Sequence, residues 1–386
     1  MKKILIFNGW YLPSKRCGGP VTSIRNTVNA CCDEFEFYIV ALNHDFGDST
    51  VFSNITDGWN QVENAKVLYV PDKYFDFNKK HLKSLFEELK PELIWFSGIL
   101  HPEIKLPAMA LCREMNIPVL FSPRGEVSED RVTTLKAYKK LPYLFFVRKL
   151  GFYKGGWFHA TSDDEYAGLI RYIGAEEDAI FLVRNIAVSP EPYRIGYKKE
   201  SGKVRVVFVS RIHEVKNLKL AVEVAAKVEK AEVQFDVYGP KESVDYWNEC
   251  EQIGNTAPDN IKLNYCGVLT PDEVGKTYSQ YDCFLFPTFN ENYGHVIAES
   301  LANGCPVILS RGTTPWDDLD NVAGYVCDLN SREQFTEAIE KIAELSSDSF
   351  DNLSRNTIDY YKKKLLEDGA VKGHKDMFNK IIQEGK

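Results

Sequence analysis

Two glutamates separated by seven residues lie in the segment 284–299, which reads FLFPTFNENYGHVIAE. The apolar run that ends at Pro287 predicts a buried strand, and a helix is predicted to begin near Gly294. Ligands of open parallel sheets bind beyond the carboxyl ends of the strands, and a helix N-terminus there attracts phosphate. Glu291 and Glu299 stand on either side of that helix start. The pattern therefore predicts a site for a diphosphate, with one carboxylate facing a sugar and the other a ribose.

A second polar turn follows the apolar run 204–210 and carries two cations, Arg211 and Lys216. Arginine can hold a phosphate through two parallel hydrogen bonds, and lysine supplies a compact point charge. Together they could neutralise a diphosphate leaving group. The competing interpretations are a basic turn that caps a helix and, for Glu291 and Glu299, two solvated side chains.

Short apolar runs alternate with amphipathic stretches along the chain. The runs that predict strands are 3–7, 35–41, 66–70, 93–97, 119–122, 157–160, 204–210, 233–238, 261–265, 283–287 and 306–310. The stretches that predict helices include 21–31, 79–89, 218–227, 271–280, 296–302 and 332–345. Such alternation is typical of parallel sheets covered by helices on both faces. Two successive series predict an α/β chain with two Rossmann-like domains.

The length of 386 residues also favours two domains. The segment 190–203, with its prolines, glycines and charges, is typical of an exposed linker. We expect an N-terminal domain over 1–195 and a C-terminal domain over 196–360. A charged helical segment over 361–386 is expected to pack back toward the N-terminal domain.

Composition narrows the classes of partner and compartment. The net charge of −8 disfavours a nucleic-acid partner, because binding to a phosphate backbone needs positive charge. The nine cysteines form no Cys-x-x-Cys pair, which is typical of free thiols in a reducing compartment. The apolar run after Met1 is too short for a signal peptide, and no window approaches the roughly 20 apolar residues of a membrane span. These features predict a cytoplasmic protein. No metal is expected, since the histidines lack ligand spacing and the Asp-x-Asp at 318–320 is interpreted as a coincidence.

Several of these segments resemble the retaining glycosyltransferases of the family 4 type, whose GT-B fold consists of two facing Rossmann-like domains with a cleft between them. The segments that carry the resemblance are the Glu-x7-Glu block 291–299 with its Tyr293-Gly294 pair, the basic block 210–217, the segments 304–308, 324–326 and 265–268, and Gly18-Gly19-Pro20. The resemblance implies a hexosyltransferase that takes a sugar from a nucleotide-sugar donor, with uridine diphosphate favoured by family frequency. The acceptor would be a saccharide or lipid-linked saccharide, the anomeric configuration would be retained, and neither a cofactor nor a metal would be needed.

The family's functional residues can be carried over position by position. Arg211, Lys216 and Glu291 would be the catalytic residues, with the two cations on the donor diphosphate and Glu291 on the transferred sugar. Glu299 would bind the ribose. The other donor-binding positions implied by the resemblance are Gly19, Gly267, Val268, Asn292, Tyr293, Gly294 and His295.

The first domain departs from the family at one position. Many members carry a histidine near the reacting sugar, whereas the segment 121–126 reads FSPRGE and offers Arg124. A related subgroup associated with bacterial surface polysaccharides shows this Ser-Pro-Arg-Gly pattern, which implies a role in polysaccharide biosynthesis. Arg124 would then bind the acceptor or a donor phosphate. The alternative is a turn arginine paired with Glu126.

The stretch 131–154 combines seven basic residues with many large apolar ones and contains no acid. Such a surface could dock on anionic lipid, which would suit a lipid-linked acceptor and a peripheral place on the inner face of the membrane. The competing interpretation is a core-packed helix with a solvated basic face.

Other functions stay open at this point. A sugar-nucleotide epimerase would use the same fold. A glycoside hydrolase would use two carboxylates that flank a bond, without a phosphate-binding helix start. A non-catalytic protein would bind the donor without turning it over.

Overall fold

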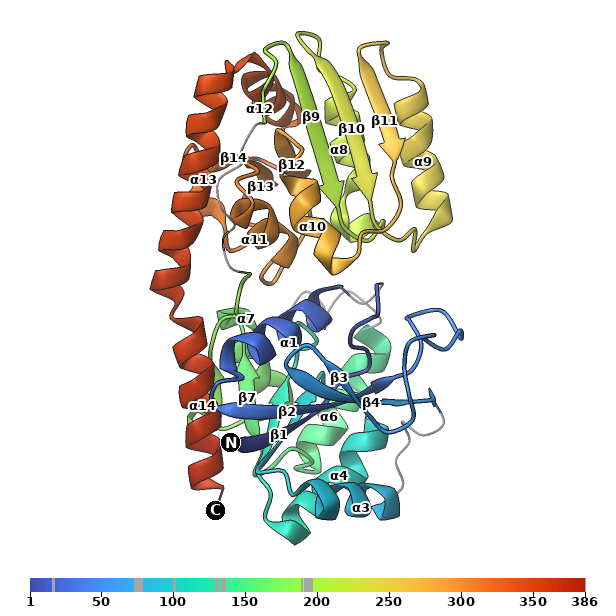
Figure 1. The fold of residues 1–386 in the computed structure, drawn as a ribbon, viewed down its shortest axis with the longest axis vertical. Coiled ribbons are helices and arrows are strands. Elements are labelled where there is room, and N and C mark those ends of the chain that lie inside the picture. The colour runs from blue at the N-terminus through green and yellow to red at the C-terminus, as the bar shows by residue number, and fades with distance from the viewer. Residues whose placement is uncertain are drawn as a thin grey trace. The chain divides into compact units, whose positions relative to one another are not determined.

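The computed structural model of the chain describes residues 1–15, 18–72, 79–99, 102–128, 132, 137–188, 190 and 197–385. The chain divides into two compact units, Met1–Ile186 together with Gly369–Lys386, and Ala187–Asp368. Each unit is built on a largely parallel sheet covered by helices (Figure 1). The chain passes between the units after Ile186 and after Asp368, whereas the boundaries expected from the sequence were after residues 195 and 360. Most of the expected linker, 191–196, lies outside the described residues.

The first unit contains a sheet with the strand order β3-β4-β2-β1-β5-β6-β7-β8. Its strands are β1 (Lys2–Phe7), β2 (Phe35–Leu42), β3 (Trp59–Val62), β4 (Ala65–Val70), β5 (Leu93–Ser97), β6 (Val119–Ser122), β7 (Trp157–Ala160) and β8 (Ile180–Leu182). Neighbouring strands are parallel except for the β3–β4 hairpin at one edge. The order changes direction between β1 and β5, which is where parallel sheets of this kind bind ligands.

Helices pack on both faces of this sheet. They are α1 (Gly18–Cys31), α3 (Lys79–Leu89), α4 (Pro102–Met115), α6 (Ala137–Lys149), α7 (Asp163–Gly168) and, from the end of the chain, α14 (Ala370–Glu384). The last helix belongs to this unit because it buries an apolar stripe that includes Met377, Phe378 and Ile381. The Phe378 ring lies 5.5 Å from that of Trp95 on β5.

The second unit has the strand order β11-β10-β9-β12-β13-β14, and all neighbouring strands are parallel. The strands are β9 (Lys203–Val209), β10 (Glu232–Tyr238), β11 (Ile261–Tyr265), β12 (Cys283–Phe286), β13 (Val307–Ser310) and β14 (Gly324–Cys327). The helices are α8 (Leu218–Ala225), α9 (Val244–Asn255), α10 (Pro271–Tyr278), α11 (His295–Ala302), α12 (Arg332–Glu344) and α13 (Ser347–Asp368). Here the order changes direction between β9 and β12.

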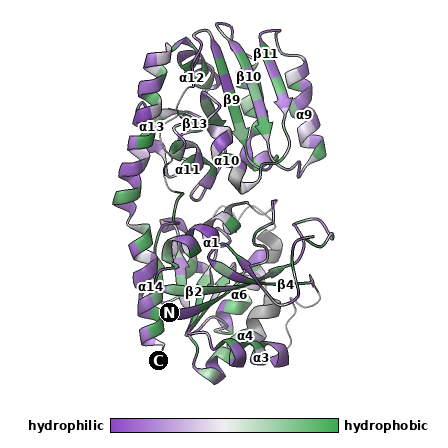
Figure 2. Cartoon of the chain, in the orientation of Figure 1, coloured by the Kyte–Doolittle hydropathy of each residue, from purple (hydrophilic) through white to green (hydrophobic). Residues whose placement is uncertain are grey.

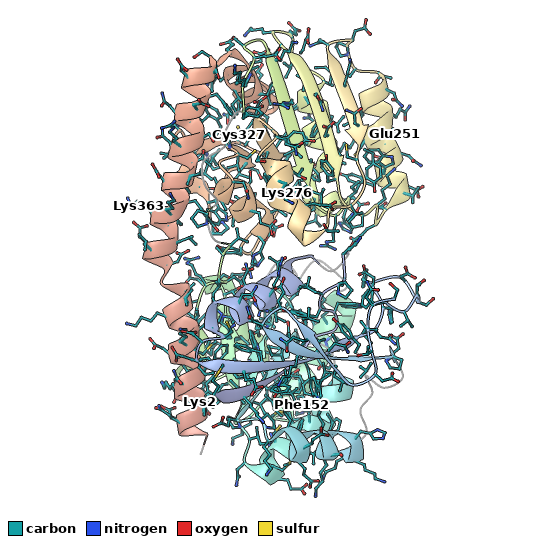
Figure 3. All side chains as sticks on the ribbon, viewed as in Figure 1. Lys2, Phe152, Glu251, Lys276, Cys327 and Lys363 are labelled. Atoms are coloured by element: carbon teal, nitrogen blue, oxygen red, sulfur yellow. The ribbon has the colours of Figure 1, made fainter. Side chains whose placement is uncertain are left out.

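Hydrophobic burial explains why these segments form strands. The central strands of both sheets are buried along most of their length, and Figure 2 shows the apolar residues concentrated on the strands and on one side of most helices. Side chains fill the space between sheet and helices in both units (Figure 3). The predicted α/β class is confirmed. Each of the eleven predicted strands matches an observed strand to within one residue at each end, whereas β3, β8 and β14 were not predicted. The eight cysteines of the described residues are free thiols, and most are buried.

Two histidines meet in the core of the first unit, with their ring centroids 4.9 Å apart. His159 on β7 places Nε2 2.8 Å from the Val183 carbonyl oxygen, which can only accept. Nε2 therefore carries the proton, and Nδ1 accepts from the Ser122 hydroxyl at 3.0 Å. His374 on α14 donates from Nδ1 to the Ala370 carbonyl at 2.9 Å.

The geometry keeps both imidazoles neutral. Nε2 of His374 is buried and has no hydrogen-bond partner, so a proton on it would find no acceptor. Burial lowers the pKa of both rings, that of His374 to about 4, and the charge of nearby Arg124 acts in the same direction. The pair therefore packs as an uncharged aromatic contact between α14 and the sheet.

We predict that acid weakens the first unit through His374. The unfolded chain takes up a proton near pH 6.5, whereas folded His374 resists protonation until about pH 4, so stability falls as the pH drops through that window. At about 1.4 kcal/mol per pKa unit, the effect is on the order of 3 kcal/mol. His374→Leu should flatten the dependence of the melting temperature on pH between these values. The exposed His81→Gln is the control, and an unchanged slope in His374→Leu would contradict the assignment.

Candidate active site

The loops that follow β9 and β12 meet at the point where the strand order of the second unit changes direction. The backbone N–H of Phe289 donates to the Val215 carbonyl at 3.0 Å, and the Thr288 hydroxyl donates to the same oxygen at 3.1 Å. These bonds tie the two loops together at the carboxyl edge of the sheet. This is the edge at which ligands of open α/β sheets bind.

Lys216 and Glu291 form an ion pair across these two loops, with Nζ donating to Oε1. Both side chains are largely buried, with 7% of Lys216 and 18% of Glu291 exposed. The ammonium also lies 5.8 Å from the centre of the Phe286 ring. A buried charge is costly unless an opposite charge compensates it. The ion pair therefore fixes the positions of both head groups.

A tight turn brings Lys216 to this place. His213 caps a short 3-10 turn over Glu214–Lys216 by accepting from the Val215 N–H at 3.2 Å. Asn217 then adopts a left-handed conformation with φ 56°, and its side-chain amide donates to the Pro287 carbonyl at 2.9 Å. Asparagine tolerates this conformation better than most residues, so the turn both redirects the chain into α8 and binds the neighbouring loop.

Glu291 is held from the side of β13. Its N–H donates to the Thr313 carbonyl at 2.8 Å, and the hydroxyls of Thr313 and Ser310 lie 2.7 Å apart. Ser310 donates in turn to the Thr288 carbonyl at 2.6 Å. The Glu291 carboxylate therefore lies on a loop that is held by hydrogen bonds to the segments following β9 and β13.

The helix start predicted after this loop is present. Gly294 precedes α11 with φ 76°, and a Cβ at that position would lie 2.7 Å from Cδ1 of Ile297. The positive φ favours glycine here, and a Cβ would in addition require the Ile297 side chain to shift. The carbonyl of Tyr293 accepts from the buried Trp316 indole at 2.6 Å, so Trp316 anchors the loop. The first N–H groups of α11 lack partners within the helix, as at any helix start, and suit an anion.

Arg211 stands apart from the ion pair. Its Nη1 lies 2.9 and 3.0 Å from the two carboxylate oxygens of Glu242, and 44% of its side chain is exposed. Glu242 was not singled out from the sequence, because the contact depends on the loop after β10. An exposed pair of this kind contributes about 0–1 kcal/mol, so exchange of Glu242 for a phosphate costs little.

The remaining donor-binding positions predicted in the second unit are distributed along the same edge. Glu299 lies half-buried on α11, and its charge adds to burial in raising the pKa of Tyr278. Gly267 and Val268 follow β11, and the Gly267 carbonyl accepts from the N–H of Gly239 at 2.8 Å. The structure thus joins Lys216 directly to Glu291 and places the Gly267 segment two strands from β9.

Arg124 follows β6 in the first unit and adopts a left-handed conformation with φ 52°. Its Nη1 donates to Ser23 Oγ at 2.6 Å and to Asn185 Oδ1 at 2.8 Å, and the guanidinium lies 5.4 Å from the Trp95 ring. Nε and Nη2 are buried and have no hydrogen-bond partner. Arg124 therefore does not pair with Glu126, whose carboxylate instead accepts from the backbone of the loop after β5.

Gly19, the other predicted donor-binding residue of this unit, lies exposed in the first turn of α1. Burial lowers the pKa of Arg124 to about 10, which leaves its guanidinium charged at neutral pH. The edge after β1 and β6 therefore holds a fixed positive charge with unused donors. No motif in the sequence pointed to Ser23 or Asn185 as its partners.

The described part of the stretch 131–154 includes α6, whereas Arg131 and Lys136 lie outside the described residues. Leu144 and Val147 are buried on one side of the helix. On other sides four large apolar side chains are exposed, namely Leu141 (41%), Phe145 (60%), Phe146 (59%) and Leu150 (78%). The helix therefore packs into the core on one side, as one of the two interpretations expects, and its outer surface carries apolar side chains as well as basic ones.

Two absences hold for the described residues. No group of three or more histidine, cysteine, aspartate or glutamate side chains is arranged to hold a metal ion there. Asp318 is instead bound to Lys364 at 2.7 Å and to the Tyr360 hydroxyl at 2.9 Å. Within the same ranges no helix is sufficiently long and apolar to cross a bilayer.

Comparison with known proteins identifies the fold and a matching family model. Residues 191–364 match the family model described as glycosyl transferases group 1. Sucrose-phosphate synthase from Thermosynechococcus elongatus has the same fold over 100% of both chains, with a TM-score of 0.72 and 14% identity. HepE from Anabaena, solved with UDP and glucose, covers 99% of both chains with a TM-score of 0.69 and 12% identity. The fold of the whole chain is thus the GT-B fold.

Among curated proteins, sulfoquinovosyl transferase SQD2 of Arabidopsis thaliana is 30% identical over 112 residues, which are 29% of this chain and 20% of that protein. The alignments with curated relatives span between 20% and 46% of the relatives' own length.

Proposed function

We propose that the chain, whose residues 191–364 match the model of the glycosyl transferases group 1, is a glycosyltransferase that takes a hexosyl group from a uridine diphosphate sugar. The observation that carries the proposal is the Lys216–Glu291 ion pair at the switch point of the second sheet, beside the start of α11. The bound UDP and glucose of the structurally similar HepE support the choice of donor.

The ion pair suits a donor because each partner can be exchanged for a group of the substrate. Diphosphate oxygens would replace the Glu291 carboxylate around Lys216, and sugar hydroxyls would replace the ammonium at Glu291. Neither head group has to move far, since both loops are fixed by hydrogen bonds to neighbouring strands. The start of α11 would add further donors to the diphosphate.

The reaction would proceed without metal. The bond between the anomeric carbon and the diphosphate oxygen breaks, and a bond from the acceptor oxygen to the same carbon forms on the same face. The acceptor proton passes to the leaving phosphate oxygen. Lys216 and, after release from Glu242, Arg211 would stabilise the charge that develops on the diphosphate. Glu299, Gly267, Val268, Asn292, Tyr293, His295 and Gly19 complete the proposed donor site.

We place the acceptor at Arg124. Its two unpaired N–H edges form the fork that matches a carboxylate or phosphate, and leaving them buried and unused is unfavourable for the protein alone. An anion on the acceptor, such as the phosphate of a lipid-linked saccharide, would satisfy them. The Ser-Pro-Arg-Gly sequence supports a role in the synthesis of bacterial surface polysaccharide.

We further propose that α6 docks on an anionic membrane from the cytoplasmic side. Leu141 and Phe145, like Phe146 and Leu150, are four residues apart and so form one helical surface. Arg148 and Lys149 are exposed beside them. Aromatic rings with a basic rim fit the headgroup region of anionic lipid, where each Lys or Arg contributes about 1 kcal/mol.

The donor assignment predicts that UDP and a UDP-sugar raise the melting temperature without added metal, because they bind only the folded state. In Glu291→Gln the shift with UDP should persist, while transfer falls by a factor on the order of 10²–10³. Glu214→Gln, an exposed carboxylate in the same turn, is the control. No shift with any nucleoside diphosphate would refute the donor site. Sugar release from an oligosaccharide without nucleotide would identify a hydrolase, and UDP release without an acceptor would favour the epimerase.

The acceptor assignment predicts that Arg124→Gln changes acceptor binding and leaves donor binding intact. The KM for a lipid-phosphate-linked acceptor should rise at least about tenfold, which corresponds to about 1.4 kcal/mol, while the UDP-induced thermal shift stays unchanged. The melting temperature should not fall, because the variant removes a buried, incompletely paired cation. Loss of UDP binding with an unchanged acceptor KM would show instead that Arg124 holds a donor phosphate.

The docking surface predicts that the protein floats with vesicles of phosphatidylglycerol and phosphatidylcholine at low salt and not with phosphatidylcholine alone. Phe145→Ser combined with Phe146→Ser should remove binding, because it deletes the apolar anchor. Leu366→Ser on α13 is the matched control, since that leucine is 85% exposed on the second unit. Equal flotation of the double variant and the wild-type protein would disprove the surface.

A further inference from the structure

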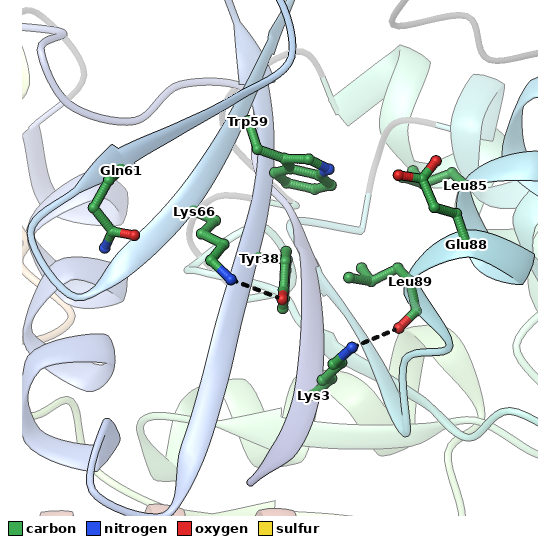
Figure 4. A pocket seen from close by; sticks show the side chains of 8 residues that line it. All are labelled: Lys3, Tyr38, Trp59, Gln61, Lys66, Leu85, Glu88 and Leu89. Atoms are coloured by element: carbon green, nitrogen blue, oxygen red, sulfur yellow. Dashed lines mark hydrogen bonds between the residues drawn. The ribbon is translucent and has the colours of Figure 1, made fainter.

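The first unit contains a pocket at the amino end of β1, away from the edge that carries Arg124. It has a volume of about 400 Å³, within the range of roughly 300–1,000 Å³ that is typical of small-molecule sites. The end of α3, the β3–β4 hairpin and the strands β1 and β2 enclose it. Its lining residues are Lys3, Tyr38, Trp59, Gln61, Lys66, Leu85, Glu88 and Leu89 (Figure 4).

Aromatic and apolar side chains form part of its wall. The rings of Trp59 and Tyr38 meet edge to face with centroids 5.1 Å apart. Leu85 and Leu89, from the last turns of α3, are buried beside them. Figure 4 shows Trp59 and the two leucines on different sides of the opening, with Tyr38 between them. A ligand with an apolar face could therefore lie against the indole.

Some polar groups of the lining already form hydrogen bonds within the protein, and others do not. Lys66 is paired with Glu36 at 2.8 Å and donates to the Tyr38 hydroxyl at 3.2 Å, and Lys3 donates to the Leu89 carbonyl at 3.3 Å. By contrast, nothing in the described part of the chain hydrogen-bonds to the Glu88 carboxylate or to the indole N–H of Trp59. The pocket thus presents a solvent-exposed acceptor at Glu88 and a donor at the Trp59 indole, besides the spare N–H groups of Lys3.

The balance of charge decides the class of ligand. Two ammonium groups, Lys3 and Lys66, stand near two carboxylates, Glu36 and Glu88, so the pocket has no net charge. A free anion would meet Glu88, and a cation would meet Lys3, which disfavours both. A neutral molecule with hydroxyls that both donate and accept, and with one apolar C–H face for the indole, satisfies all of these groups.

We propose that this pocket binds a neutral saccharide. Its position separates it from the proposed site of transfer, because Lys3 lies at the amino end of β1, whereas Gly19 follows the carboxyl end. At about 3.3 Å per residue along β1, the two edges are on the order of 15 Å apart. The pocket would hold a part of a glycan remote from the reacting sugar. Only the identity of that glycan as acceptor or product rests on the proposed transferase function.

Direct binding tests the pocket without any transfer reaction. A panel of neutral oligosaccharides with gluco, galacto and manno configurations is titrated into the wild-type protein by calorimetry, in the absence of nucleotide. We expect at least one of them to bind, and Trp59→Ala and Glu88→Gln each to weaken that binding at least about tenfold. Glu87→Gln, the neighbouring exposed carboxylate on α3, should leave it unchanged. Retention of the UDP-induced thermal shift in Trp59→Ala shows that the variant is folded.

The outcomes separate this proposal from the transferase function. No binding by any neutral oligosaccharide, or binding that Trp59→Ala and Glu88→Gln leave intact, overturns the pocket whatever the donor site does. Competition by UDP would place the bound sugar in the donor site and also overturn it. Binding that depends on Trp59 and survives Glu291→Gln supports the pocket even if no transfer is ever observed.

Discussion

The mutual burial of Lys216 and Glu291 is the constraint on which the proposed site depends. The two residues are 75 positions apart in sequence and meet only because β9 and β12 are neighbours in a parallel sheet. Neither charge could be withdrawn from water alone, so the loops that carry them have to close on one another. The turn at Asn217, the bond from Ser310 and the Thr313 carbonyl fix the loops in that position. A donor would therefore meet groups already in place and exchange partners with them.

The charges of the two proposed sites are held differently. In the second unit Lys216 and Glu291 are paired with one another, and Arg211 is paired with Glu242. In the first unit Arg124 keeps two buried N–H edges without one. A buried guanidinium is costly when it is incompletely paired, which makes an external anion the most direct compensation. If the proposed sites are correct, the donor would exchange partners with groups that are already paired, whereas the acceptor would supply a partner that Arg124 lacks.

A feature could be predicted from the sequence when the residues that form it lie within one short segment, and not when it depends on contacts between distant segments. The strand, loop and helix start around Glu291 lie within one short segment, and Lys216 follows a similarly clear strand, so both were identified. Arg211 was identified as a cation, but its link to Glu242 depends on the loop after β10 and has no local signal. The exposed apolar surface of α6 was foreseen only as one of two alternatives, since apolar residues occur all round that helix and periodicity gave no preferred face. The site of transfer itself stays a prediction, because the comparisons establish the fold and the domain and not the roles of single residues.

The two points at which the chain passes between the units were harder to predict from the sequence than the strands. Residues next to the first of them are hydrogen-bonded to Arg124 and to its partner Ser23. Asn185 accepts from Arg124 and from Ser23, and the next carbonyl, that of Ile186, accepts from Asn26 at 2.9 Å. The chain leaves the first unit directly after Ile186 and re-enters it at Gly369, a few residues before His374 packs on His159. Such contacts join residues at least 61 positions apart, so no short sequence window contains them. Arg124 also lowers the pKa of both histidines, so residues next to both crossing points belong to one hydrogen-bonded and electrostatic cluster of the first unit.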